Sequence, residues 1–417
     1  MLMISFLILV GAYALIAWDK IPKVTVVMIA ASLIIFLAHA SAQQVFSYID
    51  FQVLFLLIGM MIIVHITSRS GVFRWVAIEL LRHTKGEPRY ILVGLGVITA
   101  VLSAFIDNVT TVVIILPIVF TISKELEIDP IPFLMTLILA SNIGGTATLI
   151  GDPPNIIIGT AAGLNFMDFV HELTGVVTVI FIVSILLLVY LYRKELVFKQ
   201  EYQDKILLLD NSGSIKDRPL MYKSLTVLFL VIAGFILHNL IHYDAYAIAL
   251  AGASVLLLFE KPRQVMHEVE WTTIFFFIGL FIVIGGFAEA GGIKLLADKL
   301  IHLTAGDRTL TTMFVLWASG FLSAIIDNIP YTVTMVPLIK ELKGVMDVYP
   351  LWWALSLGAC LGGNATIIGA SANVVVAEAS HARGVNISFY NYFKVGSLLT
   401  LVALLISSGY LYLRFLM

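Results

Sequence analysis

The sequence predicts an all-α polytopic membrane protein, and three observations support this prediction. Hydrophobic residues make up 60% of the 417 residues and charged residues only 12%, against about 25% charged in ordinary soluble domains. Apolar runs of about 15 to 20 residues follow one another, each long enough to cross a hydrocarbon core as a helix. A polar motif of the first half also recurs in the second half.

Composition excludes several other classes of protein. The net charge of -2 is uninformative about partners. Nothing in the sequence resembles a nucleic-acid patch, so no nucleic-acid partner is expected, and a β-barrel would show alternating segments of about 10 residues. Cys360 is the only cysteine, so an intrachain disulfide and a thiolate metal cage are excluded. We expect no metal centre and no cofactor. The apolar N-terminus lacks a basic region and a cleavage site, so it is interpreted as the first span.

The first inverted repeat is expected to cover residues 1–192. Hydropathy predicts spans over 4–18, 24–38, 51–67 and 169–192, and an amphipathic helix at the membrane interface over 71–82. A re-entrant hairpin is expected near 90–123, because Asp107 and Asn108 interrupt its apolar sequence. A broken helix is expected near 131–164, because Gly and Pro residues interrupt it.

A polar cytoplasmic linker is expected over 193–223, followed by a second inverted repeat over 224–417. Here the spans fall near 225–240, 245–259, 271–288 and 393–415, and an amphipathic helix near 293–301. A hairpin is expected near 308–345 and a broken helix near 350–378. The whole chain would then have about 10 transmembrane helices plus two re-entrant hairpins.

The two halves match residue by residue at their polar positions. A shift of 220 positions (327 minus 107) or 218 positions (373 minus 155) aligns identical residues. These pairs include Ser103/Ser323, Asp107/Asp327, Asn108/Asn328, Pro117/Pro337, Gly144/Gly362, Gly145/Gly363 and Asn155/Asn373. Similarity between apolar helices would match Leu and Ile by chance, but not these polar positions in register, so we interpret them as an internal duplication.

The number of membrane crossings in each half predicts how the two halves are oriented. If each hairpin enters and leaves by one side, each half crosses the membrane an odd number of times, and the two halves are inverted. Placing the linker in the cytoplasm puts most of the 25 Lys and Arg residues inside, as the positive-inside rule requires. We therefore expect a multi-pass protein of the plasma or inner membrane with both termini extracytoplasmic.

Inverted repeats with broken helices are typical of secondary transporters, whose sites lie near mid-membrane between the repeats. A break exposes backbone polar groups, which is tolerated only where protein or a polar cavity satisfies them. Asp107 and Asp327, at the two hairpin breaks, are the candidates for proton coupling, since an intramembrane carboxylate is costly and usually functional. The alternative is that each only caps the following half-helix.

Asp152 precedes Pro153, which is typical of a helix start, so a capping role competes with a functional one. Its counterpart in the repeat is Ala370, so this carboxylate belongs to one half only. The other candidates for ion or substrate binding are polar residues at the breaks, whose alternative role is interhelical hydrogen bonding. They are Asn108, Thr110, Asn142, Thr146, Thr148, Asn155, Asn328, Asn364, Thr366 and Asn373.

The strings FIDNVTTVVIILPI and SNIGGTATLIGDPPNIIIG resemble the branch of the ion-transporter superfamily that contains the ArsB arsenite exporters, the NhaD sodium/proton antiporters and the P protein. The second string is closest to P-protein-like members. The resemblance implies two inverted repeats, elevator-type movement and a homodimer. Related dicarboxylate carriers have Ser-Asn-Thr at the hairpin tips, where this chain has Asp107-Asn108-Val109 and Asp327-Asn328-Ile329. That difference favours proton coupling.

The leading hypothesis is a proton-coupled antiporter that exports arsenite, antimonite or Na⁺ by alternating access, with membrane lipids, protons and the ion as partners. A carrier of citrate-like or inorganic anions is the alternative, and a passive channel fits less well. An enzyme is not expected: Asp244 could begin an aspartyl-protease signature, but Leu149 stands where the second half, G-x-G-D, needs Gly. No Walker loop occurs either.

Overall fold

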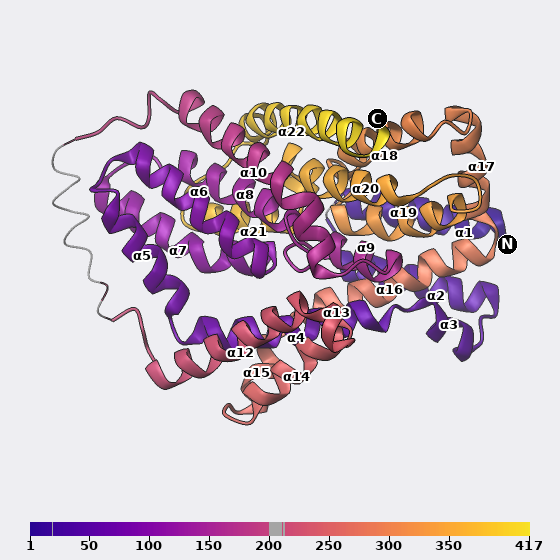
Figure 1. Ribbon diagram of the computed structural model, residues 1–417, viewed down its shortest axis with the longest axis horizontal. Helices are drawn as coiled ribbons and strands as arrows, with labels where there is room; N and C mark the ends of the chain where they lie inside the picture. Colours follow the sequence, from indigo (N-terminus) through magenta and orange to yellow (C-terminus); the bar gives the residue numbers. More distant parts are fainter. Residues whose placement is uncertain (19, 200–210, 212) are drawn as a thin grey trace.

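A computed structural model of the chain describes all residues except 19, 200–210 and 212 (Figure 1). The middle of the predicted linker over 193–223 therefore lies outside the described residues, at 200–210 and 212. In the described part of the chain every regular element is a helix, in agreement with the predicted all-α class.

Seven described helices are long and apolar enough to cross a membrane. They are α4 (Phe51–Arg69), α6 (Pro88–Phe105), α7 (Asn108–Leu126), α10 (Phe166–Leu191), α12 (Arg218–Ile236), α16 (Trp271–Glu289) and α22 (Phe389–Leu411), which η3 (Tyr412–Leu416) extends. Four shorter apolar helices are α1 (Leu2–Trp18), α2 (Lys23–Ala38), α8 (Ile131–Thr146) and α14 (Ala245–Leu257). These helices confirm a polytopic membrane fold.

The remaining helices are short, amphipathic or parts of the interrupted segments. They are α3 (Ala42–Tyr48), α5 (Val72–His83), α9 (Pro153–Ala162), α13 (His238–Ile241), α15 (Pro262–Glu268), α17 (Gly292–Thr304), α18 (Arg308–Ser323), α19 (Asn328–Leu342), α20 (Tyr349–Gly362), η1 (Gly363–Ala365), η2 (Ile367–Gly369) and α21 (Ser371–His381). The helix pair α6–α7 thus recurs as α18–α19, and α8–α9 recurs as α20–α21.

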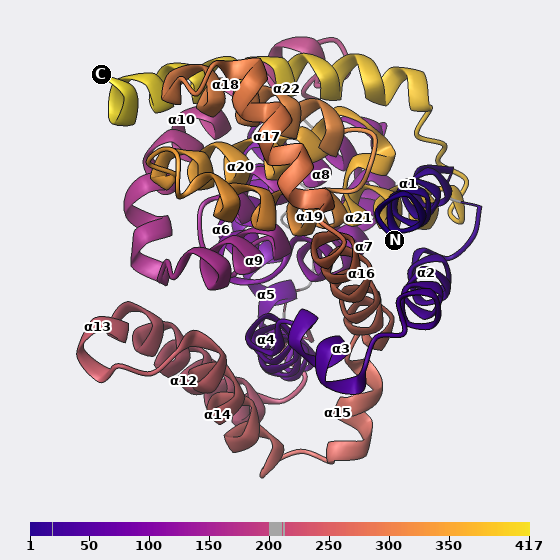
Figure 2. The same ribbon diagram turned by 90° about the vertical axis from the view of Figure 1, so that its right-hand side faces the viewer.

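The helices form two groups, which we call the frame and the hairpin bundle. The frame consists of α1, α2, α4, α12, α14 and α16. It combines helices from both halves of the chain, because α4 packs on α14 and α2 packs on α16. The hairpin bundle consists of α6–α10 and α18–α22, in which α6 packs on α8 and α18 on α20. Figure 2 shows α4, α12 and α14 below the bundle and α2 at its right side.

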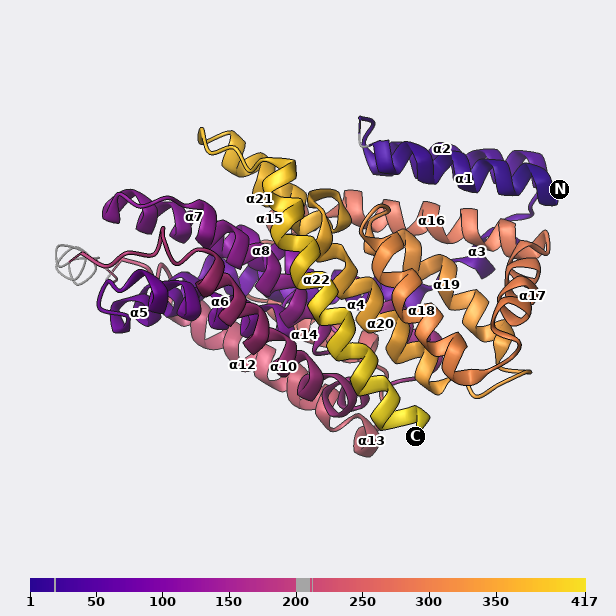
Figure 3. The ribbon, with the colours of Figure 1, turned by 90° about the horizontal axis from the view of Figure 1, so that it is seen from above.

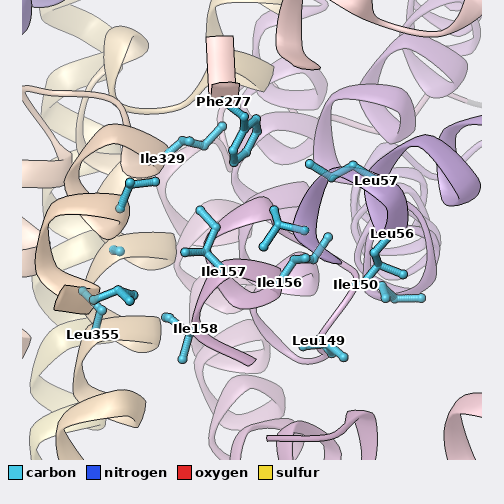
Figure 4. Close-up of a cluster of buried hydrophobic side chains, with 14 of the residues drawn as sticks. Leu56, Leu57, Leu149, Ile150, Ile156, Ile157, Ile158, Phe277, Ile329 and Leu355 are labelled. Atoms are coloured by element: carbon cyan, nitrogen blue, oxygen red, sulfur yellow. The ribbon is translucent and has the colours of Figure 1, made fainter. Parts of the chain in front are cut away.

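Two hairpins approach the middle of the bundle from opposite ends. In Figures 1 and 3 the α6–α7 pair lies toward the left end of the molecule and the α18–α19 pair toward the right end. Helix α9 packs on α19 and α7 packs on α21, so the two halves of the chain meet where the helices are interrupted. Figure 4 shows Ile156 and Ile157 of α9 between Leu57 of α4 and Ile329 of α19.

Glycines allow the closest approach between helices inside the bundle. A Cβ atom added at Gly144 of α8 would lie 2.2 Å from the carbonyl oxygen of Ala100 in α6, and one added at Gly362 of α20 would lie 2.5 Å from that of Gly320 in α18. Real Cβ atoms never come so close to backbone. The equivalent glycines of the two halves therefore set the same tight helix contact twice.

We predict that Gly144→Ala lowers the thermal unfolding temperature of the purified protein in detergent. The added methyl group meets backbone that cannot move aside, and overpacking of this kind costs about 1–3 kcal/mol. Gly175→Ala in α10 is the matched control, because nothing lies within 4 Å of an added Cβ there and helical Gly→Ala gains about 0.5–1 kcal/mol. Equal melting temperatures for the two variants would contradict this packing.

Candidate functional site

The two hairpin aspartates both cap the helix that follows them. One carboxylate oxygen of Asp107 accepts a hydrogen bond from the Thr110 backbone N–H at 2.8 Å, and one of Asp327 accepts from the Ile329 N–H at 3.2 Å. The capping role considered from the sequence is therefore present at both tips. Each carboxylate has a second oxygen beyond the cap bond, so capping leaves room for another role.

Asp327 has two further partners, and both come from distant segments. Its Oδ2 atom lies 2.7 Å from Nζ of Lys23, the first residue of α2, and accepts a hydrogen bond from Oγ of Ser371 at 2.9 Å. The Asp327 side chain is only 1% exposed and that of Lys23 is 22% exposed. The second hairpin tip is thus bound to the frame by a largely buried ion pair.

Asp152 does not cap α9, so the capping alternative for this residue is wrong. It occupies the N-cap position without a side-chain hydrogen bond to the helix. Both of its carboxylate oxygens instead accept from Nδ2 of Asn328, at 3.2 Å each, and the residue is fully buried. Asp152 therefore joins the interruption of the first half to the hairpin tip of the second.

Four buried asparagines form a second connection between the halves. Asn108 donates to Oδ1 of Asn142 at 3.0 Å. Asn142 in turn donates to Oδ1 of Asn364 at 2.8 Å and of Asn373 at 2.9 Å. Buried amides are stable where partners satisfy them, and here the partners come from both repeats. The chain of amides fixes the positions of the hairpin tip and both interruptions.

The interruptions themselves are held by two equivalent asparagines. Nδ2 of Asn155 donates to the carbonyl oxygens of Thr146 and Thr148 at 3.1 and 2.9 Å. Nδ2 of Asn373 donates to those of Gly363 and Thr366 at 2.8 and 2.9 Å. These carbonyl groups have lost their helical partners, so the amides satisfy groups that hydrocarbon cannot.

The hydroxyl groups of three predicted threonines also donate to backbone carbonyl groups, and none of these three residues lines the cavity described below. The Thr146 hydroxyl donates to the Asn142 carbonyl at 2.8 Å. Those of Thr148 and Thr366 donate to the carbonyl oxygens of Ala104 and Ala324, the second at 2.5 Å. Thr148 and Thr366 thereby tie each interruption to the hairpin of its own half.

A cavity of about 320 Å³ lies where the frame meets the bundle. Its polar lining includes Asp107 and Asn108 of the first hairpin tip, Asn328 of the second tip, and Asp152. Apolar side chains of α4, α9 and α16 form much of the remaining wall, including Leu57, Ile156 and Phe276. The cavity therefore contains carboxylates from the bundle in a chamber whose wall is mostly apolar.

Five polar residues that line the cavity were not predicted from the sequence, namely Lys23, Glu270, Thr272, Thr273 and Ser371. Lys23 and Glu270 stand at the first turns of α2 and α16, outside the duplicated motifs. For Glu270 the sequence did contain a signal, because the shift of 220 positions pairs it with Asp50. Asp50 caps α4 by accepting from the backbone N–H groups of Gln52 and Val53. Glu270 makes no such cap bond.

The remaining predicted residues are not among those that line the cavity. They are Thr110, Asn142, Thr146, Thr148, Asn155, Asp327, Asn364, Thr366 and Asn373. Cys360 is also buried and is not among the residues that line the cavity, and its Sγ lies 3.6 Å from Oδ1 of Asn155. A smaller cavity of about 120 Å³ lies elsewhere at the boundary between frame and bundle and includes Gln52, Thr160 and Asp244.

Comparison with known proteins agrees with this architecture. The family model described as citrate transporter matches residues 13–358. An uncharacterized transporter of Mycobacterium bovis is 40% identical over 100% of this chain and 99% of its own length. The 46 kDa membrane protein of Mycobacterium leprae is 39% identical with the same coverage. The human P protein is 33% identical over 98% of this chain, which spans 59% of that relative.

The match to the family model covers most of the chain, and relatives above 30% identity cover nearly all of it. The resemblance to the P protein noted from the hairpin and GGTATLIGDPPN motifs is confirmed. The chain is therefore a multi-pass membrane transporter that belongs to the citrate transporter family.

Proposed function

We propose that this transporter is a proton-coupled antiporter that exports a small inorganic ion, with Na⁺ as the first candidate and arsenite or antimonite as the second. One observation carries the proposal: Asp107, Asp152 and Glu270 line one cavity, with Asp327 next to it. These four carboxylates face a single ammonium group among the described lining residues, that of Lys23. The site therefore carries an excess of acidic groups.

An excess of carboxylates in a largely apolar chamber favours a cation or a proton as the partner. A charge removed from water is stable only where an opposite charge or hydrogen bonds compensate it. Asp107 and Asp152 come from different segments of the bundle but share one chamber. A cation and protons would compensate the same groups, so binding one would release the other. Competition of this kind is the basis of exchange.

The two cavities at the boundary between frame and bundle differ in volume, and this difference supports alternating access. The larger one reaches the first residues of α2 and α16, which we expect on the cytoplasmic side. The smaller one, about 120 Å³, adjoins the beginnings of α4 and α14, which we expect on the opposite side. This arrangement would suit a state that receives its substrate from the cytoplasm of a plasma or inner membrane.

Na⁺ fits the cavity better than arsenite does, and a carrier of citrate-like anions is the second candidate function. Arsenite prefers thiol ligands, and Cys360 is buried outside the cavity lining. The anion carrier is favoured by the description of the family and by Lys23, which could pair with an anion. The acidic side chains around Lys23 argue against it.

We predict that Na⁺ or arsenite collapses an imposed pH gradient in proteoliposomes that contain the full chain. Asp107→Asn and Asp327→Asn each remove one titratable group of the site and should lower the proton flux at least about tenfold, equivalent to ~1.4 kcal/mol in the barrier. A pH-sensitive dye inside the vesicles reports the flux.

Asp298→Asn is the matched control, since this aspartate is exposed on α17, away from the cavity. Normal proton flux with unchanged pH dependence in both cavity variants would refute the proton-coupling role. Uptake of succinate or citrate without an effect of either substitution would favour the anion carrier.

We also predict sidedness for single cysteines placed in the Cys360→Ala background. Thr272→Cys lines the larger cavity and Thr160→Cys the smaller one. An impermeant maleimide should label Thr272→Cys from the same side as a Lys216→Cys reporter on the linker, and Thr160→Cys more slowly from the other side. Labelling of both positions from one side would contradict the predicted orientation.

A further inference from the structure

Lys23 occupies a position that helix stability does not explain. It is the first residue of α2, after Pro22, which provides no side-chain cap. The N-terminal end of a helix carries partial positive charge, so an ammonium group there is unfavourable and an acidic residue would be preferred. Some other interaction must therefore account for the orientation of this side chain at the start of α2.

That interaction is the ion pair with Asp327. The Lys23 ammonium lies 2.7 Å from Oδ2 of Asp327, the same oxygen that accepts from the Ser371 hydroxyl at 2.9 Å. The other oxygen accepts the capping bond from the Ile329 N–H. The hydroxyl and the capping N–H belong to the bundle, whereas the ammonium belongs to the frame. The ammonium thus takes the place that a bound cation would need.

The equivalent carboxylate of the other half has different surroundings. Among the described contacts Asp107 accepts a hydrogen bond from the Thr110 N–H and forms no ion pair. The repeat counterpart of Ser371 is Pro153, which has no hydroxyl group. Two aspartates that match in sequence therefore differ in structure, because the frame supplies an ammonium group to only one of them.

Glu270 is a carboxylate of the frame that lines the same cavity as Lys23. It stands at the start of α16, on which α2 packs. Its described hydrogen bond comes from the Thr273 hydroxyl at 3.1 Å, and it does not cap its helix as Asp50 does in the repeat. The frame itself therefore carries a carboxylate in the cavity that Lys23 lines.

We propose that the Lys23 ammonium is a tethered cation that competes with the transported cation for Asp327. This inference rests on the proposed cation exchange and identifies Lys23 as the residue that sets its affinity. When a cation binds at Asp327, Lys23 is displaced toward Glu270. When the cation leaves, Lys23 returns, so Asp327 is never an uncompensated buried carboxylate, a state that is strongly destabilising.

The test compares Lys23→Gln, Lys23→Arg and wild type in proteoliposomes, with Na⁺ and Li⁺ as separate probes. Removing the competitor should lower the KM for cation-driven proton flux about 5-fold or more, the usual lower end of coupling between linked ligands. Lys23→Arg keeps the positive charge, so its KM should stay within about twofold of the wild-type value, which is below the usual range of coupling between linked ligands. Lys20→Gln is the matched control, because Lys20 is an exposed lysine in the loop just before α2.

A measurement of binding covers the case in which a variant transports poorly. Na⁺ should raise the unfolding temperature of detergent-solubilised Lys23→Gln at a lower concentration than it does for wild type. Glu270→Gln should act in the opposite sense and raise the KM, because the ammonium then stays at Asp327.

The outcomes separate this inference from the proposed function. Cation-driven flux in wild type, with an unchanged or raised KM in Lys23→Gln, overturns the role of Lys23 and leaves the antiporter standing. Loss of citrate uptake in Lys23→Gln also overturns it, since Lys23 would then be an anion ligand. Absence of flux with Na⁺ and Li⁺ and also with arsenite in wild type overturns the proposed function and this inference together.

Discussion

The structure depends on satisfying the backbone where helices are interrupted inside the membrane. Hydrocarbon offers no partner to a carbonyl group that has lost its helical hydrogen bond. Asn155 and Asn373 provide these partners from the helix that follows each interruption. With the interruptions held in this way, the hairpin tips can meet them, and carboxylates such as Asp152 can face a cavity instead of lipid.

Much of the fold could be predicted from the sequence because its signals are local. Apolar length indicates the spans, and helices α7 and α19 begin at Asn108 and Asn328, immediately after the aspartates identified as breaks. The contacts of Lys23 were not predictable in this way. Its partner is more than 300 positions away at Asp327, and neither hydropathy nor the repeat connects them. The capping alternative for Asp152 was wrong for the same reason, since Asn328 binds its carboxylate from the other half.

The duplication gives the halves the same scaffold, and a few substitutions make them chemically different. Asp152 stands opposite Ala370 in the repeat, and Ser371 opposite Pro153. Lys23 and Glu270 of the frame then add charged groups to the larger cavity between frame and bundle. Equal backbones with unequal charge would make the two hairpin aspartates respond differently to a cation, which is the property that coupled exchange requires.

The most direct test of a site shared by protons and a cation is proton release on binding. Na⁺ or Li⁺ is added to the detergent-solubilised full chain in weakly buffered solution, and a pH-sensitive dye follows the free proton concentration. The account predicts that protons are released as the cation binds and that the release saturates with cation concentration. Saturable cation binding without proton release, or proton uptake on binding citrate alone, would contradict it.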